Sequence, residues 1–166
     1  MPAGSPIILD INALVNAVIG DPSSFISWPA LPPKTNNPAA DCVGIVNDCR
    51  EFSLWLSPHI CDNTVRVLAA FGWSEDLCRG YLSVLTQIAA QSGGGVVLPE
   101  RTVNDCPDFE DNLILDLAAE VGAMLIVSDD SDMTDMSPWR ATPILRSADF
   151  ASRVDATRRV RRRLPG

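Results

Sequence analysis

The sequence predicts a single-domain α/β sandwich whose central sheet is mainly parallel. Short apolar runs typical of buried strands alternate along the chain with segments that place apolar residues at helical spacing. This alternation is expected when helices form the crossovers between parallel strands. The chain has 166 residues, of which 46% are hydrophobic, and this suits one domain with a sizeable core.

The first strand is predicted at residues 7–10, IILD, an apolar run that ends in Asp10. The following segment has apolar residues at helical spacing, and Gly20 is a plausible end for that helix. Residues 21–38 contain five prolines, which predicts a loop rather than a helix.

The middle of the chain is predicted to form helix, strand, helix and helix. Residues 39–49 have helical character, and residues 52–57 form an apolar run typical of a strand. Pro58 suits the first position of a helix that ends at Gly72, and Ser74 is suited to cap the next helix.

The C-terminal part continues the alternation. After a glycine-rich turn, the sequence predicts a short strand within residues 93–100, a helix over 106–123, strands over 124–128 and 142–146, and a last helix over 147–156.

Charge is unevenly distributed along the chain. The net charge is −8, yet Arg153–Arg163 has six arginines and one aspartate, which leaves −13 on the rest. This asymmetry predicts one domain over 1–152 and a flexible basic arm over 153–166. The arm fits binding to RNA phosphates, with a solubilising tail as the alternative. Its candidate RNA-binding residues are Arg158, Arg159, Arg161, Arg162 and Arg163.

Several classes of protein are disfavoured by composition. The five cysteines show no C-x-x-C spacing, and His59 is the only histidine, which argues against a zinc site or a Ser-His-Asp triad. No apolar stretch reaches the roughly 18 residues that a membrane span needs. The N-terminus lacks the features of a signal peptide, so we expect a cytoplasmic location.

Acidic side chains gather where two predicted strands end. Asp10 ends the first strand, Asp129 and Asp130 follow the strand at 124–128, and Asp111 lies near the start of the helix before it. The carboxyl ends of parallel strands meet at one edge of a sheet, where ligands bind. Carboxylates gathered in this way suit Mg²⁺ or Mn²⁺ and the hydrolysis of phosphodiesters. The alternative is a solvated acidic surface with helix caps.

Four segments resemble the PIN-domain nuclease family, in the family's order, over roughly residues 6–150. LDINALVNAVIG resembles the family's opening LDTNVLVSA, and SPHICDNTVRVL resembles its SP-ILDEL-RVL helix. DFEDNLILDLAAEVGAMLIVSDDSDM resembles its DPDDNKFLELALAGGADYIVTGDKDL, and TPILRSADF resembles its closing I-I-TP-EF. The resemblance implies a PIN-like three-layer α/β/α sandwich and a metal-dependent endoribonuclease of the VapC-like toxin branch.

By position in these motifs, the resemblance implies three catalytic acids, Asp10, Asp111 and Asp130. Together with Asp132 as an auxiliary acid, they would be the ligands of Mg²⁺ or Mn²⁺. A metal held there would polarise a backbone phosphate and orient the attacking water, without a covalent enzyme intermediate.

Three supporting residues follow from the same motifs. Asn12 would orient metal or water, and Ser128 would hydrogen-bond an active-site carboxylate or a phosphate. Asn63 stands where the family has a glutamate, so metal affinity or water activation is expected to be weaker. Asp129 replaces a glycine and adds negative charge.

The resemblance therefore implies a metal-dependent endoribonuclease that hydrolyses RNA phosphodiester bonds, and a role as the toxin paired with a small antitoxin. Homo-oligomers are expected and contact with a membrane is not. One alternative is a catalytically weak or inactive PIN-like module that binds RNA or protein, which Asn63 makes credible. Another is a haloacid-dehalogenase-like phosphatase, although that family wants an acid at the position of Asn12 and a lysine, and Lys34 lies in the proline-rich loop.

Overall fold

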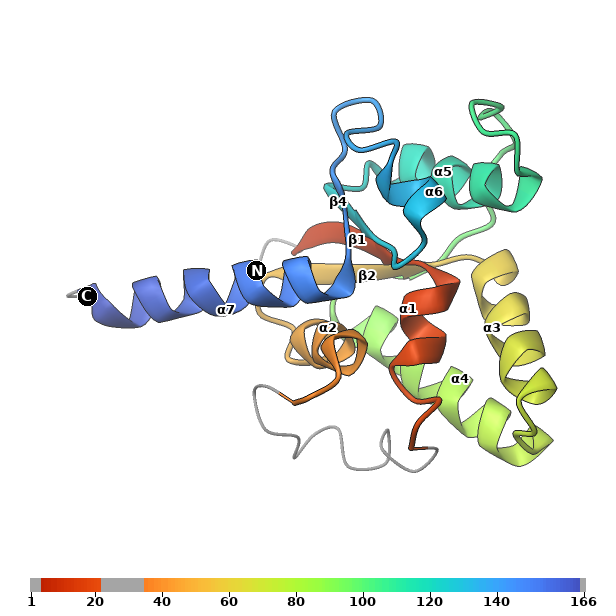
Figure 1. Cartoon of the computed structure of the whole chain (residues 1–166), viewed down its shortest axis with the longest axis horizontal. Coiled ribbons are helices and arrows are strands. Elements are labelled where there is room, and N and C mark those ends of the chain that lie inside the picture. The colour runs from red at the N-terminus through yellow and green to blue at the C-terminus, as the bar shows by residue number, and fades with distance from the viewer. Residues whose placement is uncertain (1–3, 22–34, 165–166) are drawn as a thin grey trace.

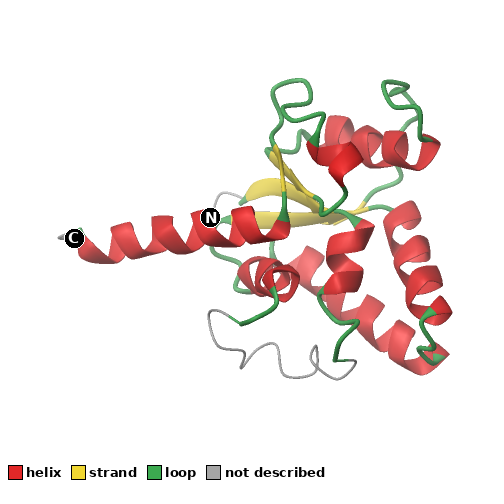
Figure 2. Ribbon diagram, viewed as in Figure 1, coloured by secondary structure: helices red, strands yellow, loops and turns green. Residues whose placement is uncertain are grey.

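The computed structural model describes residues 4–21 and 35–164, and its centre is one sheet of five parallel strands (Figures 1 and 2). The strand order is β3-β2-β1-β4-β5, and every pairing between these strands is parallel. The strands are β1 Ser5–Leu9, β2 Phe52–Leu56, β3 Gly95–Val96, β4 Leu125–Val127 and β5 Ile144–Leu145.

Helices cover both faces of the sheet, which confirms the predicted three-layer α/β/α sandwich. In Figure 1, α5 and α6 lie on one side of the sheet, whereas α1, α2, α3 and α4 lie on the other. The helices are α1 Ile11–Asn16, α2 Pro38–Asn47, α3 Pro58–Ala70, α4 Glu75–Gln91, α5 Phe109–Val121, α6 Ser131–Thr134 and α7 Ser147–Arg163. None of these described helices is long and apolar enough to span a membrane.

The central strand β1 is fully buried where it approaches its end. Ile7, Ile8 and Leu9 have no exposed surface, because β2 pairs on one side, β4 pairs on the other, and helices cover both faces. This burial explains why an unbroken apolar run indicates a parallel strand here. It also places the residue after Leu9, Asp10, at the carboxyl edge of the sheet.

Two element boundaries differ from the predicted ones in the first half of the chain. The helix α1 ends at Asn16, and a turn leads on toward Gly20. Residues 22–34, most of the predicted proline-rich loop, lie outside the described residues. The helix α2 begins at Pro38, where the side chain of Asn37 accepts hydrogen bonds from the first turn.

The last helix is longer than predicted. The sequence predicts an end near residue 156 and a flexible arm from residue 153, but α7 continues to Arg163. The arginines favour this continuation because cations are stabilising near the C-terminal end of a helix. An ion pair of 3.1 Å between Arg159 and Asp155, four residues apart, adds to it. The expected boundary after residue 152 therefore falls inside a helix.

Arg158 is part of the fold and not of a free basic surface. Its guanidinium lies 2.8 Å from a carboxylate oxygen of Asp48 and 2.5 Å from one of Glu51, and its side chain is only 14% exposed. Its hydrogen bond holds the pKa of Glu51 below the usual range. The prediction that Arg158 binds RNA stays a prediction, and any RNA phosphate would have to compete with the two carboxylates that already neutralise this cation.

A buried carboxylate fixes α5 to the loop before it. Asp116 is 1% exposed and accepts hydrogen bonds from the backbone N–H groups of Thr102 at 2.9 Å and Val103 at 2.7 Å. It also accepts one from the guanidinium of Arg101. Burial raises the pKa of Asp116, but these donors lower it by more, so that the net shift is downward. Asp116 thus holds α5 in place.

We expect Asp116→Ala to lower the free energy of unfolding by about 3 kcal/mol, because two backbone donors and an arginine would lose their buried acceptor. Urea denaturation of the metal-free protein measures the change. Glu120→Ala, at an exposed acid on the same helix, is the matched control and should stay within about 0.5 kcal/mol of the parent. Equal stability of the two variants would contradict this account.

Candidate active site

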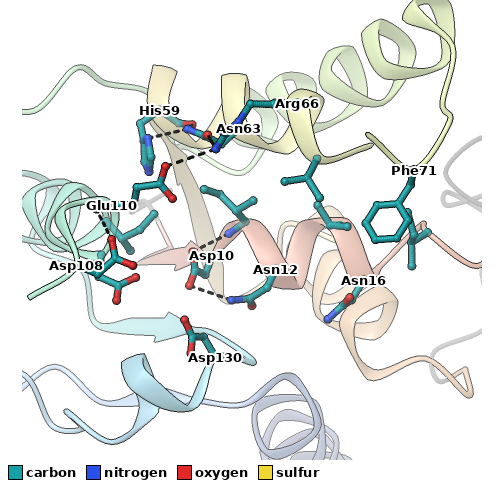
Figure 3. Close-up of a pocket in the computed structure, with 16 residues that line it drawn as sticks. Asp10, Asn12, Asn16, His59, Asn63, Arg66, Phe71, Asp108, Glu110 and Asp130 are labelled. Carbon is teal, nitrogen blue, oxygen red and sulfur yellow. Dashed lines mark hydrogen bonds and ion pairs between the residues drawn. The ribbon is translucent and has the colours of Figure 1, made fainter. Parts of the chain in front are cut away.

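A pocket of about 440 Å³ lies at the carboxyl edge of the sheet, between α1, α3 and the first turn of α5 (Figure 3). Five carboxylates line it, from three different parts of the chain. They are Asp10, Asp108, Glu110, Asp111 and Asp130. The structure thus brings together the three predicted catalytic acids around one space.

Asp10 is held in place by three donors. Its Oδ1 accepts from the backbone N–H of Ile11 at 2.7 Å, which caps α1. Its Oδ2 accepts from the hydroxyl of Ser128 at 2.7 Å and from the side-chain amide of Asn12 at 3.2 Å. Burial raises the pKa of Asp10, the Ser128 hydrogen bond lowers it, and the net shift is upward. The carboxylate is therefore fixed but carries a desolvation cost.

Asn12 and Ser128 join the ends of β1 and β4. The Asn12 amide donates to Ser128 Oγ at 3.2 Å, and its carbonyl oxygen accepts from the backbone N–H of Asp129 at 2.8 Å. Ser128 has no exposed surface, and its Oγ also accepts from the backbone N–H of Asp130 at 3.2 Å. Both side chains therefore position the acids around them, and neither faces the pocket as a free group.

Asp111 enters the pocket from the first turn of α5. The amide of Asn112 anchors this turn by exchanging two hydrogen bonds of 2.9 Å with the backbone of Cys106. Burial, followed by the negative charges of Asp108 and Asp10, raises the pKa of Asp111 to about 6. The acids of the pocket therefore repel one another in the absence of a cation.

The adjacent aspartates after β4 have different roles. Asp130 lines the pocket and caps the short helix α6, its Oδ1 accepting from the N–H of Asp132 at 3.0 Å. Asp129 instead binds the first residue of α7, accepting from Ser147 N–H at 2.9 Å and from Ser147 Oγ–H at 2.8 Å. The negative charge that Asp129 adds therefore lies beside α7, and Asp129 is not among the residues that line the pocket. Asp132 is exposed and does not line the pocket.

The wall formed by α3 contains Asn63, which the sequence motifs assign to the site, and two residues that they do not assign, His59 and Arg66. Asn63 donates to Nδ1 of His59 at 2.8 Å and accepts from the guanidinium of Arg66. Arg66 in turn lies 3.4 Å from Glu110 on α5, across the pocket (Figure 3). Burial lowers the pKa of His59, so its ring is neutral at neutral pH. The spacing of these α3 residues, three or four apart, is the sequence signal that points to them.

The donor chemistry of the pocket fits a hard divalent cation. Carboxylate oxygens are the preferred ligands of Mg²⁺ and Mn²⁺, and a cation would relieve the repulsion felt by Asp111. Within the described residues, no three His, Cys, Asp or Glu side chains are gathered closely enough to hold an ion as they stand. Mg²⁺ keeps several of its waters and often uses only one or two carboxylates, so water would complete its shell here.

The fold and the site together define an α/β domain with an acidic ligand pocket at the carboxyl ends of its parallel strands. The family model of the PIN domain matches residues 6–132, and the chain belongs to the PIN domain family. PIN domains are generally nucleases and typically use divalent metal ions. The match does not support the alternative of a haloacid-dehalogenase-like phosphatase. No curated protein matches the chain significantly.

Asp129→Asn and Asp130→Asn form a matched pair of neighbouring substitutions. We expect Asp129→Asn to lower the free energy of unfolding by about 1–2 kcal/mol, because one of its two acceptors for Ser147 is lost. Asp130→Asn should stay within about 0.5 kcal/mol, because asparagine also caps a helix. Urea denaturation without metal measures both values, and the reverse order would refute these assignments.

Asp111→Asn should stabilise the metal-free protein at neutral pH. The pKa of Asp111 is about 6 in the folded protein against a reference value of 3.8, so ionisation of this group destabilises the fold. The gain should be about 1 kcal/mol above pH 6, after allowance for solvent screening, and should fade as the pH falls toward about 4. Thermal unfolding across this range, with a chelator present, measures it. A gain that does not depend on pH would contradict the charge explanation.

Proposed function

We propose that this protein is a metal-dependent endoribonuclease that hydrolyses RNA phosphodiester bonds, with Mg²⁺ or Mn²⁺ in the acidic pocket. The observation that carries the proposal is the convergence of Asp10, Asp111 and Asp130, from three separate segments, on one pocket of a PIN domain. Family membership supports the nuclease class, and the resemblance of the motifs supports RNA as the substrate.

The roles of the acids follow from how each is held. Asp10, Asp111 and Asp130 would hold the ion, directly or through waters of its shell, and a bound ion would polarise a phosphate oxygen and activate a water. Ser128 and Asn12 keep the Asp10 carboxylate oriented, so that little reorganisation is needed when substrate arrives. Hydrolysis forms one bond from the water oxygen to phosphorus and breaks one ester bond, with no covalent bond to the protein.

The arginines near the end of α7 would support binding of RNA at a distance from the pocket. Arg159, Arg161, Arg162 and Arg163 belong to this group, and the end of α7 projects away from the sheet (Figure 1). Each phosphate that they neutralise would add salt-dependent affinity. The resemblance to VapC-like toxins supports two further proposals, a small antitoxin as partner and a cytoplasmic homo-oligomer.

A binding module without hydrolysis is the second candidate function, and Asn63 is the observation that favours it. The position has an amide where the family's motif has a glutamate, and that amide is already engaged by His59 and Arg66. The pocket therefore has one carboxylate fewer on the α3 side. Binding of RNA without cleavage in any divalent metal would support this candidate.

We expect the purified protein to cleave a mixed pool of structured RNA only with Mg²⁺ or Mn²⁺ present, and a chelator should abolish cleavage. The Asp10→Asn, Asp130→Asn double variant should lose at least about a hundredfold in rate, because two ligands of the ion lose their charge. Gel analysis of end-labelled RNA measures the rates. Glu120→Gln, outside the pocket on α5, is the control and should cleave like the parent. Full activity of the double variant would refute the proposed site.

A further inference from the structure

The pocket extends well beyond its acids. From the carboxylates it continues between α1 and α3, as far as an exposed aromatic ring (Figure 3). We call this far end the Phe71 subsite. Its lining residues are Asn16, Ile19, Arg66, Val67 and Phe71.

Phe71 presents its ring to this part of the pocket. The residue is 67% exposed and directly follows α3. His59, Asn63, Val67 and Phe71 are spaced by four residues, so one stripe of α3 leads from the acidic end to the ring. A single exposed apolar residue is ordinary on a protein surface. Here the ring is continuous with a pocket that already gathers five carboxylates.

Arg66 lies between the acids and the ring. Among the described residues that line the pocket, it is the one cationic side chain, because the ring of His59 is neutral. Its side chain is 68% exposed, and its contact with Glu110 is a long 3.4 Å. A phosphate oxygen could therefore compete for the guanidinium, which suits bidentate contact with phosphate. Asn63 accepts a hydrogen bond from Arg66 and orients the guanidinium. Because the amide is uncharged, it does not neutralise the arginine.

We propose that the Phe71 subsite binds one unpaired nucleotide of an RNA strand, with its base stacked on Phe71 and an adjoining phosphate on Arg66. Stacking on an aromatic ring accepts any base, and the exposed amide of Asn16 offers a donor and an acceptor for the edge of the base. The inference rests on the proposed function, which places the scissile phosphate at the acids.

The geometry selects a single strand over a duplex. A base can lie against a protein ring only when it is unstacked from its neighbours, which single strands and loops permit. Asn63 and Phe71 are eight residues apart, or roughly 12 Å along α3 at 1.5 Å per residue. The ring therefore contacts a nucleotide near the cleaved bond, and the subsite makes unpaired RNA the preferred substrate.

The test is a binding measurement in chelator, where hydrolysis is off. Fluorescence anisotropy of a labelled oligo-uridine reports the affinity of each variant for a single strand. Phe71→Ala should weaken binding about tenfold, and Phe71→Leu by nearly as much, because both remove the stacking surface. Phe71→Trp should retain the affinity of the parent. An abasic ribose-phosphate strand should bind the parent and Phe71→Ala equally.

The second arm tests the charge. Arg66→Gln should weaken binding about threefold to tenfold and reduce the dependence of affinity on salt by about one phosphate contact. Arg79→Gln is the matched control, since the Arg79 side chain is also 68% exposed but lies outside the pocket on α4. Phe109→Ala removes a ring of similar exposure, 60%, that does not line the pocket, and should bind like the parent.

Each outcome separates this inference from the proposed function. Unchanged binding by Phe71→Ala, or an equal loss of affinity for duplex and single-stranded RNA, would overturn the subsite even if the parent cleaves RNA. Dependence of binding on Phe71 and Arg66 in a protein that cleaves nothing would uphold the subsite while the proposed hydrolysis fails. If the parent binds no RNA, the inference is overturned, and the exposed ring would then suit a protein partner.

Discussion

The burial of several neighbouring carboxylates is the constraint around which this site is arranged. Burial is the main cause of the raised pKa values of Asp10 and Asp111, and the negative charges of neighbouring acids in the pocket add to it. Separate anchors hold each group. Hydrogen bonds from Ser128 and Asn12 fix Asp10, the Asn112 amide fixes the turn that contains Asp111, and the pairing of buried Asp116 with Arg101 fixes the helix behind it. These contacts hold the carboxylates together, and a bound cation would reduce the repulsion between them.

The sequence predicts those strands and helices whose local pattern of residues is compatible with only one structure. Apolar runs that end in acids suit parallel strands that open on one edge, and the order of the motifs then brings Asp10, Asp111 and Asp130 to the same place. The same reasoning cannot separate Asp129 from Asp130. Both follow the same strand, and only the position of Ser147, eighteen residues further along the chain, determines which carboxylate faces α7.

The remaining differences between prediction and structure have the same origin. The arginines of the C-terminal segment are alike in sequence, yet Arg158 meets two carboxylates that belong to the segment before β2. The family's motif on α3 points to Asn63 alone, whereas helical spacing brings His59 and Arg66 to the same wall. Contacts between distant segments cannot be read from local periodicity, but a stripe on a single helix can be.

The helix α7 is attached to two segments that lie far apart in the sequence. Its first residue, Ser147, is bound to Asp129 beside the acidic pocket, and Arg158 is clamped to Glu51 just before β2 begins. The helix is therefore attached at two points and projects beyond the second (Figure 2), with Arg161, Arg162 and Arg163 in its last turn. A molecule bound to the projecting end of α7 is therefore linked to the site through Ser147 and Asp129, the residue directly before Asp130.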